Sequence, residues 1–315
     1  MVTIVHAVGY GGPEQLALAE IDLPEPGVGQ VALAVRAAGV NPFDLKLYSG
    51  LIGNDPAALP IRLGSEVAGV VTAVGPDPDG PLGPVSVGDE VIAFRVSGGY
   101  ATNLVVRAKA VIPKPATLGW AEAGGLMLAG ATAVHALTAT AVGPGDTVLV
   151  HGGSGGVGLM AVQLAVLRGA RVIATASPRR HEALVRLGAE PVSYGDGLTA
   201  RVRALAPEGI DAALDLVGSD EALATSLALV PDRDRIATIA NFTSGPAAGI
   251  KVLGAGPGAD PGEAIRNAAR PELARLAGDG SLRVQVGATF ALADVADAHR
   301  LVASGHADGK VVLLP

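Results

Sequence analysis

A glycine-rich turn with the sequence HGGSGGVG, residues 151–158, separates a predicted strand from a predicted helix. Its glycines Gly153, Gly155 and Gly158 satisfy the spacing G-x-G-x-x-G. Such glycines allow a sharp turn, a close approach to a pyrophosphate and tight packing of helix on strand, while the helix N-terminus offers free N–H groups. The turn predicts a dinucleotide site, and the alternative is a purely structural turn. Ser154 is expected at that site and not as a hydrolase nucleophile, because the G-x-S-x-G spacing is absent.

The turn after the next predicted strand carries two arginines and no acid. Residues 174–180 read ATASPRR and contain Ser177, Arg179 and Arg180. A site that prefers NAD usually places Asp or Glu here to hold the ribose hydroxyls, whereas serine and arginine suit a 2′-phosphate. The alternative is that both arginines are solvated residues in the first turn of a helix, but two cations there oppose the helix dipole. We therefore predict NADPH as the cofactor.

Strands and helices alternate around these motifs. After Trp120 we expect strands over 147–150, 171–175, 210–216 and 235–240, helices over 157–168 and 179–187, and an Ala/Leu-rich helix between the last two strands. This alternation predicts a doubly wound parallel sheet with helices on both faces.

The first third of the chain reads as β-rich. Short apolar runs at 31–35, 67–71 and 90–94 are separated by Gly, Pro and Asp, which predicts a compact, partly antiparallel barrel. The tail should add helices over 263–277 and 294–303 and strands over 284–290 and 311–314. Because 315 residues exceed one typical core, we expect two domains. Their predicted extents are 1–118 with 268–315 for a catalytic domain, and 119–267 for a cofactor domain.

Composition limits the partners and the chemistry. The net charge of -7 argues against nucleic acid, and the absence of cysteine excludes disulfides, thiolate metal sites and cysteine nucleophiles. The N-terminal residues lack the pattern of a signal peptide. Residues 123–143 carry no Asp, Glu, Lys or Arg, but they are rich in Ala, Gly and Thr and predict a pair of buried helices, not a membrane span. We expect a cytoplasmic protein.

Across its whole length the chain resembles the medium-chain dehydrogenase/reductases, and specifically their zinc-free quinone oxidoreductase (ζ-crystallin-like) branch. The resemblance lies in the order and spacing of short segments: AAGVNPFD at 37–44, LGSEVAGVV at 63–71, VGDEV at 87–91, GGYA at 98–101, LAGATA at 128–133, the glycine turn, and GHADGKVVL at 305–313. It implies a GroES-like, partly open β-barrel as the catalytic domain beside the Rossmann domain.

The resemblance also bears on metal. Zinc alcohol dehydrogenases of the superfamily bind catalytic zinc through cysteine and through the histidine of a Gly-His-Glu segment, which here reads Gly64-Ser65-Glu66. We therefore predict no metal. Without a Lewis acid a simple ketone or alcohol is harder to polarise, so the expected acceptor is a quinone or an α,β-unsaturated carbonyl.

Further cofactor contacts are implied by the resemblance. The pyrophosphate would meet the glycine turn, the 2′-phosphate would meet the second turn, and the ribose and nicotinamide would meet later loops and the C-terminal segment. The positions that match are, in that order, Gly153, Gly156 and Val157; Ser177, Arg180 and Tyr194; and Thr132, Val217, Gly218, Asn241, Phe242 and Lys310.

Hydride transfer leaves negative charge on the acceptor oxygen, which needs a hydrogen-bond donor and then a proton. The segment 41–48 offers Asn41, Asp44, Lys46 and Tyr48 for this work. Many quinone oxidoreductases of this branch carry tyrosine where this chain has Lys46. The alternative is that Asn41 and Asp44 brace a turn while Lys46 and Tyr48 line a rim.

Three functions remain open at this point. The first is an NADPH-dependent quinone or enone reductase, the second an enoyl-thioester reductase of lipid or polyketide assembly, and the third a non-catalytic NADPH-binding protein, because a fold alone does not fix a function. Members of this family commonly form homodimers through edge strands, so we expect a homodimer with an edge strand near 250–253.

Overall fold

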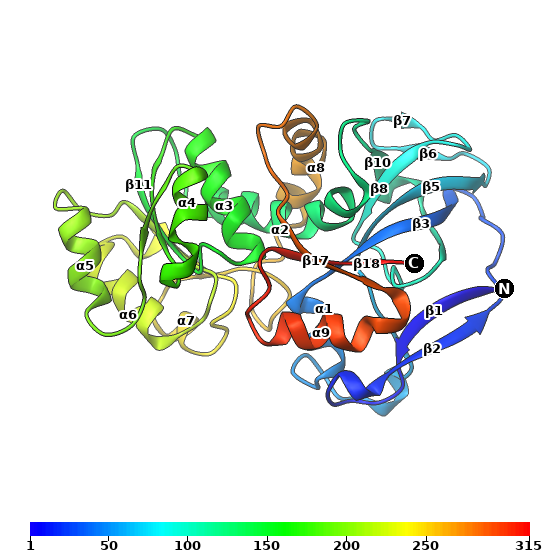
Figure 1. Ribbon diagram of the computed structural model, residues 1–315, viewed down its shortest axis with the longest axis horizontal. Coiled ribbons are helices and arrows are strands. Elements are labelled where there is room, and N and C mark those ends of the chain that lie inside the picture. Colours follow the sequence, from blue (N-terminus) through cyan, green and yellow to red (C-terminus); the bar gives the residue numbers. More distant parts are fainter. The chain divides into compact units, whose positions relative to one another are not determined.

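The structure is a computed structural model that describes all residues, 1–315, and divides into two compact units (Figure 1). The first unit comprises Met1–Leu128 and Arg270–Pro315, and the second comprises Ala129–Ala269. Each boundary falls inside a helix, namely α2 (Trp120–Ala139) and α8 (Glu263–Gly278). The sequence places the first boundary ahead of α2 and the second inside α8.

A mostly antiparallel sheet organises the first unit. Its strand order is β10-β8-β5-β3-β18-β17, with β9 also paired to β3; only β17 and β18 run parallel. A smaller sheet has the order β2-β1-β4, and β6 pairs with β7. The strands are β1 (Val2–Ala7), β2 (Leu16–Ile21), β3 (Gln30–Val40), β4 (Ile61–Arg62), β5 (Glu66–Val74), β6 (Asp79–Gly80), β7 (Gly83–Pro84), β8 (Glu90–Phe94), β9 (Asn103–Arg107), β10 (Val111–Pro113), β17 (Val286–Ala291) and β18 (Lys310–Leu314). The three apolar runs expected as strands are confirmed within β3, β5 and β8.

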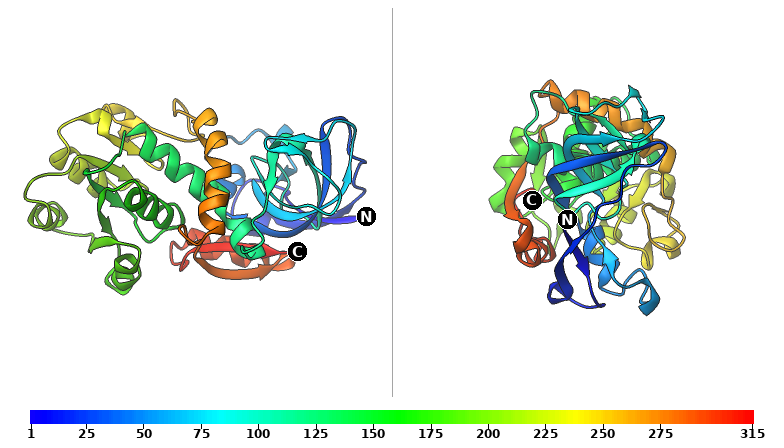
Figure 2. Two further views of the ribbon diagram at one scale, coloured as in Figure 1. Left: turned by 90° about the horizontal axis from the view of Figure 1, so that it is seen from above. Right: turned by 90° about the vertical axis from the view of Figure 1, so that its right-hand side faces the viewer.

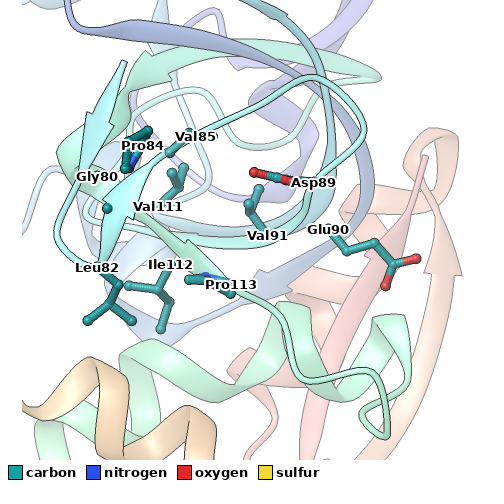
Figure 3. A pocket seen from close by; sticks show the side chains of 11 residues that line it. Gly80, Leu82, Pro84, Val85, Asp89, Glu90, Val91, Val111, Ile112 and Pro113 are labelled. Atoms are coloured by element: carbon teal, nitrogen blue, oxygen red, sulfur yellow. The ribbon is translucent and has the colours of Figure 1, made fainter. Parts of the chain in front are cut away.

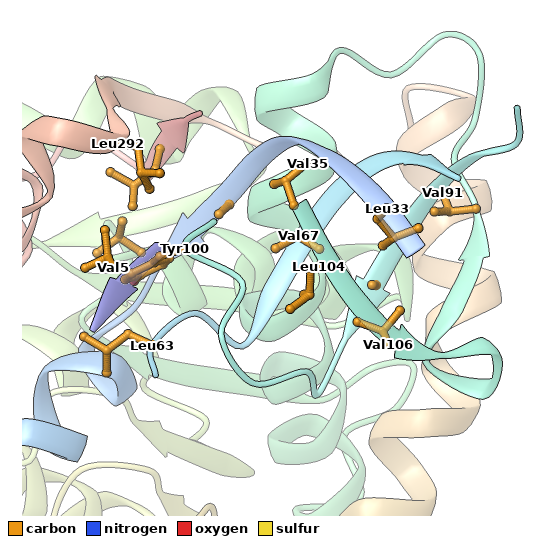
Figure 4. Close-up of a cluster of buried hydrophobic side chains, with 14 of the residues drawn as sticks. Val5, Leu33, Val35, Leu63, Val67, Val91, Tyr100, Leu104, Val106 and Leu292 are labelled. Atoms are coloured by element: carbon orange, nitrogen blue, oxygen red, sulfur yellow. The ribbon is translucent and has the colours of Figure 1, made fainter. Parts of the chain in front are cut away.

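Alternating apolar residues of these strands form one core (Figure 4). Leu33 of β3, Val67 of β5 and Leu104 of β9 are buried there, together with Val5 of β1 and the ring of Tyr100. Two helices border it, α1 (Pro42–Tyr48) and α9 (Val295–Ala303). Burial of apolar surface contributes roughly 25 cal/mol per Å², so this core is what holds α1 and α9 in place.

The second unit contains a parallel sheet of six strands in the order β13-β12-β11-β14-β15-β16. Its strands are β11 (Thr147–His151), β12 (Arg171–Thr175), β13 (Ala189–Val192), β14 (Ala212–Asp215), β15 (Ile236–Thr238) and β16 (Lys251–Val252). Its helices are α3 (Gly156–Leu167), α4 (His181–Arg186), α5 (Leu198–Leu205), α6 (Asp220–Leu229) and α7 (Ser244–Ala247), seen in green to yellow in Figures 1 and 2. The predicted doubly wound sheet is confirmed.

Residues 123–143 do not form the expected pair of helices. A single helix, α2, runs from Trp120 to Ala139 and ends where Ala141 adopts a φ of 51°. Glycine within this helix allows close packing: a Cβ on Gly124 would lie 2.7 Å from the Cβ of Ala37. None of the helices combines the length and the hydropathy that a membrane crossing requires.

Candidate functional site

The order of the parallel strands reverses between β11 and β14. From β11 the chain moves outward through β12 and β13, and it then returns to the other side of β11 to form β14, β15 and β16. Ligands of such sheets bind outside the carboxyl ends of the strands where the order reverses. The last residues of β11 and β14, His151 and Asp215, are paired in register at this point.

The glycine turn follows β11 at this position. A Cβ on Gly158 would lie 2.1 Å from the carbonyl oxygen of Gly152, and one on Gly153 would lie 2.7 Å from the Cβ of Ala174, so the packing of α3 on the sheet needs both glycines. A Cβ on Gly155 would meet no atom closer than 3.4 Å. Because Gly155 also has ordinary dihedral angles, φ -75° and ψ 169°, the chain's own packing does not explain its lack of a side chain. An open position at the N-terminus of a helix is what the predicted dinucleotide site requires.

The arginine-bearing turn follows β12, beside the glycine turn. The N–H of Gly153 donates to the carbonyl of Thr175 over 2.9 Å, and the N–H of Gly152 donates to its Oγ1 over 3.0 Å. Beyond them Ser177 and Arg180 are half-buried while Arg179 is exposed. Burial, together with the charge of Arg179, lowers the pKa of the Arg180 guanidinium. The second unit thus brings the predicted pyrophosphate and 2′-phosphate residues to neighbouring strand ends.

The remaining cofactor candidates occupy several places. Val217 and Gly218 follow β14, Asn241 and Phe242 follow β15, Tyr194 follows β13 and is exposed, and Thr132 is buried in α2. Lys310 is the one candidate that belongs to the first unit.

His151 is buried at the end of β11. Its Nε2 is 3.1 Å from the hydroxyl oxygen of Ser226 on α6, and that hydroxyl donates to the carbonyl of Ala222. Burial lowers the pKa of His151 to about 4, against the opposing charge of Asp215. The imidazole is therefore neutral at pH 7, and it ties α6 to the central strand.

In the first unit, α1 begins at a buried carboxyl group. Asp44 Oδ2 accepts from the N–H of Asn41 over 3.0 Å, and Oδ1 accepts from the N–H of Gly64 over 3.3 Å and from the hydroxyl of Ser65 over 3.4 Å. Burial raises the pKa of Asp44 to about 6, although the neighbouring Tyr100 side chain and the hydrogen bond from the N–H of Asn41 oppose that rise. This carboxyl can therefore exchange a proton near neutral pH.

A buried ion pair lies next to Asn41. The ammonium of Lys310 is 3.0 Å from Oε1 of Glu66, with side chains 5% and 0% exposed, and it also donates to Oδ1 of Asn41. The Asn41 amide donates to the same carboxylate oxygen over 3.0 Å, and the N–H of Leu128 donates to Oε2 over 2.8 Å. The structure thus joins Asn41 to Lys310 through Glu66, a residue that the sequence did not single out for this role.

Lys46 and Tyr48 lie in different surroundings. Lys46 is half-buried, and desolvation lowers the pKa of its ammonium. The hydroxyl of Tyr48 is buried 2.8 Å from Nδ1 of His299 on α9, and burial raises the pKa of Tyr48 to about 12. Burial also lowers the pKa of His299 to about 4. Tyr48 thus faces the core and bonds α1 to α9.

A shallow pocket in the first unit contains none of the predicted residues (Figure 3). It lies among β6, β7, β8 and β10 and is lined mainly by apolar side chains such as Leu82, Val91 and Ile112. It has two carboxylates: Glu90 is paired with Lys114 over 2.8 Å, and Asp89 accepts from the N–H of Ser86 over 2.8 Å. The lining offers no converging set of acids, bases and donors, so we assign no chemistry to it.

Comparison with known proteins agrees with this architecture. Residues 27–116 match the family described as "Alcohol dehydrogenase GroES-like domain", and residues 187–313 match "Zinc-binding dehydrogenase". The quinone oxidoreductase of Pseudomonas aeruginosa is 34% identical over an alignment of 336 residues that covers 100% of both chains. The chain belongs to the quinone oxidoreductase family of the medium-chain dehydrogenase/reductases.

Solved structures of similar proteins cover the same length. A mycobacterial protein solved in complex with NADPH is 30% identical, with a TM-score of 0.86 and 100% of each chain covered. The enoyl reductase of CurK is 26% identical, with a TM-score of 0.86 over 99% of each chain. The expected fold class, a GroES-like domain joined to a Rossmann domain, is confirmed.

The zinc named in one of these family descriptions does not fit the residues of this quinone oxidoreductase family member. The chain has no cysteine, and no group of three or more His, Cys, Asp or Glu side chains is placed to hold a metal ion. Ser65 stands where the superfamily's zinc ligand is histidine, and the carboxylate of Glu66 is already bound by Lys310 and Asn41. We therefore derive no chemical step through a metal.

Proposed function

We propose that the chain is an NADPH-dependent oxidoreductase that reduces a quinone or an α,β-unsaturated carbonyl. The observation that carries the proposal is the open Gly155 at the N-terminus of α3, beside the acid-free turn with Ser177 and Arg180. The NADPH complex of the mycobacterial neighbour supports the same cofactor.

The bound cofactor would supply the hydride. The protein would hold the cofactor and the acceptor and would protonate the acceptor oxygen. In the second unit, the free N–H groups at the start of α3 bind the diphosphate, and Arg180 binds the extra phosphate. In the first unit, Lys46 is the proposed donor to the acceptor oxygen, since its half-buried ammonium has a lowered pKa and so releases a proton more readily. Asn41 and Asp44 fix the start of α1, and Tyr48 fixes its end.

Quinones and enones suit this arrangement because their carbon is already electrophilic. In the first unit, the side-chain oxygens of Glu66 and Asn41 already accept from the ammonium of Lys310, so they do not fit a zinc ion. The proposed enzyme therefore relies on hydrogen-bond donors to stabilise the developing oxyanion.

The cofactor half of the proposal is tested by titrating NADPH and NADH into wild type, Gly155→Ala and Arg180→Ala. Alanine at 155 meets no protein atom closer than 3.4 Å, so Gly155→Ala should fold normally and bind both dinucleotides at least tenfold more weakly. Arg180→Ala should weaken NADPH about tenfold and leave NADH nearly unchanged. A wild-type chain that binds no dinucleotide, or prefers NADH, refutes this half.

The acceptor half is tested by following NADPH oxidation with a small quinone, an enone and an enoyl-thioester. We expect turnover with the first two, and a loss of about 10²-fold in kcat for Lys46→Met with the cofactor Kd unchanged. Lys46→Arg serves as the control that keeps the charge. Tight NADPH binding without turnover on any acceptor would instead indicate a non-catalytic binding protein.

Reduction of an enoyl-thioester is the second candidate, and the similarity to the CurK enoyl reductase favours it. An enoyl-thioester is also a conjugated carbonyl, so the proposed proton donor would serve it equally well. Faster turnover of the thioester than of both the quinone and the enone would select this candidate.

We also propose that the chain forms a homodimer through β16, which is one of the two edge strands of the parallel sheet. Edge strands present unpaired N–H and C=O groups to a second copy. Size-exclusion chromatography over a range of concentrations tests this, and a persistent monomer would refute it.

A further inference from the structure

A buried carboxylate lies where the strand order of the parallel sheet reverses, and none of the roles assigned above uses it. Asp215 ends β14 and its side chain is fully buried. Two loops start beside it: the β14 loop, residues 216–219, and the β15 loop, residues 239–243. These loops carry Val217, Gly218, Asn241 and Phe242, which were predicted to meet the ribose and nicotinamide of the cofactor.

The carboxylate fixes the β14 loop directly. Oδ1 of Asp215 accepts from the N–H of Val217 over 3.0 Å and from the N–H of Gly218 over 2.7 Å. Hydrogen bonds to an ionised acceptor are roughly twice as strong as neutral ones. Two successive amides are thus held at one oxygen, which determines the path of the loop.

The other carboxylate oxygen reaches the β15 loop through a threonine. The hydroxyl of Thr238, also fully buried, donates to Oδ2 of Asp215 over 2.9 Å. Its oxygen then accepts from the N–H of Ala240 over 3.2 Å and from the N–H of Asn241 over 3.0 Å. The side chain of Asn241 continues the network, since its Oδ1 accepts from the N–H of Ser244 over 2.8 Å.

The two loops also constrain each other sterically. Gly218 has a φ of +82°, and a Cβ there would lie 2.9 Å from the backbone carbon of Ala240. The loops can approach this closely only at a glycine, so a shift in one loop disturbs the other. One carboxylate and one hydroxyl therefore set the backbone of both loops.

We propose that Asp215 and Thr238 are positioning residues that hold both loops in their ligand-binding conformation before the cofactor arrives. The inference rests on the proposed function, because the ligand whose binding is eased is the dinucleotide. Loops that are ordered in advance bind more tightly because less conformational freedom is lost on binding. Neither residue needs to touch the cofactor for this effect.

The test compares Thr238→Val, Thr238→Ser and Thr140→Val in the full chain. Valine keeps the shape of threonine but removes the hydroxyl, whereas serine keeps the hydroxyl. Thr140 is a control in the same unit: its buried hydroxyl donates to the carbonyl of Ala136 over 2.8 Å, away from both loops. Amide hydrogen exchange of the unliganded chain and the Kd for NADPH are measured for each variant.

In Thr238→Val we expect the amides of Ala240 and Asn241 to exchange about tenfold faster and the Kd for NADPH to rise about tenfold, which corresponds to about 1.4 kcal/mol. Thr238→Ser should stay within about twofold of wild type in both measurements, and Thr140→Val should leave both unchanged. Asp215→Asn provides a second route and should speed exchange at Val217 and Gly218, because an amide oxygen is a weaker acceptor than a carboxylate.

Two results would overturn the inference. One is unchanged exchange in Thr238→Val and Asp215→Asn, and the other is faster exchange with wild-type affinity for NADPH. A wild-type chain that fails to bind NADPH would refute the proposed function instead, and the exchange measurement on the unliganded chain would still decide whether these side chains hold the loops.

Discussion

The buried pair Lys310–Glu66 should show strong energetic coupling. At 3.0 Å and an effective dielectric constant of about 20, the attraction between the two charges is about 5 kcal/mol, before the cost of removing both from water. Either single change, Lys310→Met or Glu66→Gln, leaves an uncompensated buried charge and should lower the free energy of unfolding by about 3–5 kcal/mol. The double variant removes both charges and should cost much less than the sum of the two.

Urea unfolding followed by tryptophan fluorescence measures this cycle, because Trp120 is the only tryptophan and belongs to the first unit. We expect a coupling energy of about 3 kcal/mol. The exposed pair Arg275–Glu272 is the matched control, and its cycle should show no measurable coupling. Additive effects at Lys310 and Glu66, within about 0.5 kcal/mol, would refute the argument that these charges depend on each other.

Three further predictions concern single residues. The pKa of Asp44 is about 6 in the folded state and about 3.9 in the unfolded state, so the folded state keeps this proton to higher pH. The free energy of unfolding of wild type should therefore fall by about 3 kcal/mol as pH rises from about 4 to about 6. Urea titrations at a series of pH values should show that Asp44→Asn lacks this slope. His299 should act in the opposite sense, because its folded pKa of about 4 lies below the ordinary value of about 6.5. Its contribution of about 3 kcal/mol to the free energy of unfolding is fully present above pH 6.5 and is lost as pH falls toward 4. This pH dependence should disappear in His299→Gln. Gly158→Ala should destabilise the second unit by about 3 kcal/mol in thermal unfolding, since its Cβ would lie 2.1 Å from a carbonyl oxygen, and a native-like melting temperature would contradict that packing argument.

Local patterns predicted those parts of the fold whose physics is local. The glycine turn at 151–158 lies between β11 and α3 as expected, because its glycines answer a steric need within a few residues of each other. The alternation of strands and helices likewise predicted the parallel sheet. The single helix α2 was predicted as a pair of helices, and its glycines serve close packing.

Contacts between distant segments could not be predicted in this way. Glu66 and Lys310 are 244 positions apart, so nothing near either residue indicates the pair, although a carboxylate at the head of an apolar strand does signal a need for a partner. Tyr48 was expected either to serve the acceptor oxygen or to line a rim, whereas its hydroxyl lies buried against His299. A helix of seven residues is too short for its pattern to tell an inward from an outward face. Asp215 reads as an ordinary acid until the fold brings β15 next to it.

The first unit is built from two separate stretches of the chain, which affects the order in which it can fold during synthesis. Strand β18, at the very end of the chain, pairs with both β3 and β17, and it also brings the cation that Glu66 requires. During translation the segment 129–269 leaves the ribosome before that strand. It can therefore fold before the first unit is complete. The N-terminal strands must therefore remain without this neighbour, and with an unneutralised carboxylate, until β18 has been synthesised. A chain that stops before Lys310 would lack both the strand and the cation.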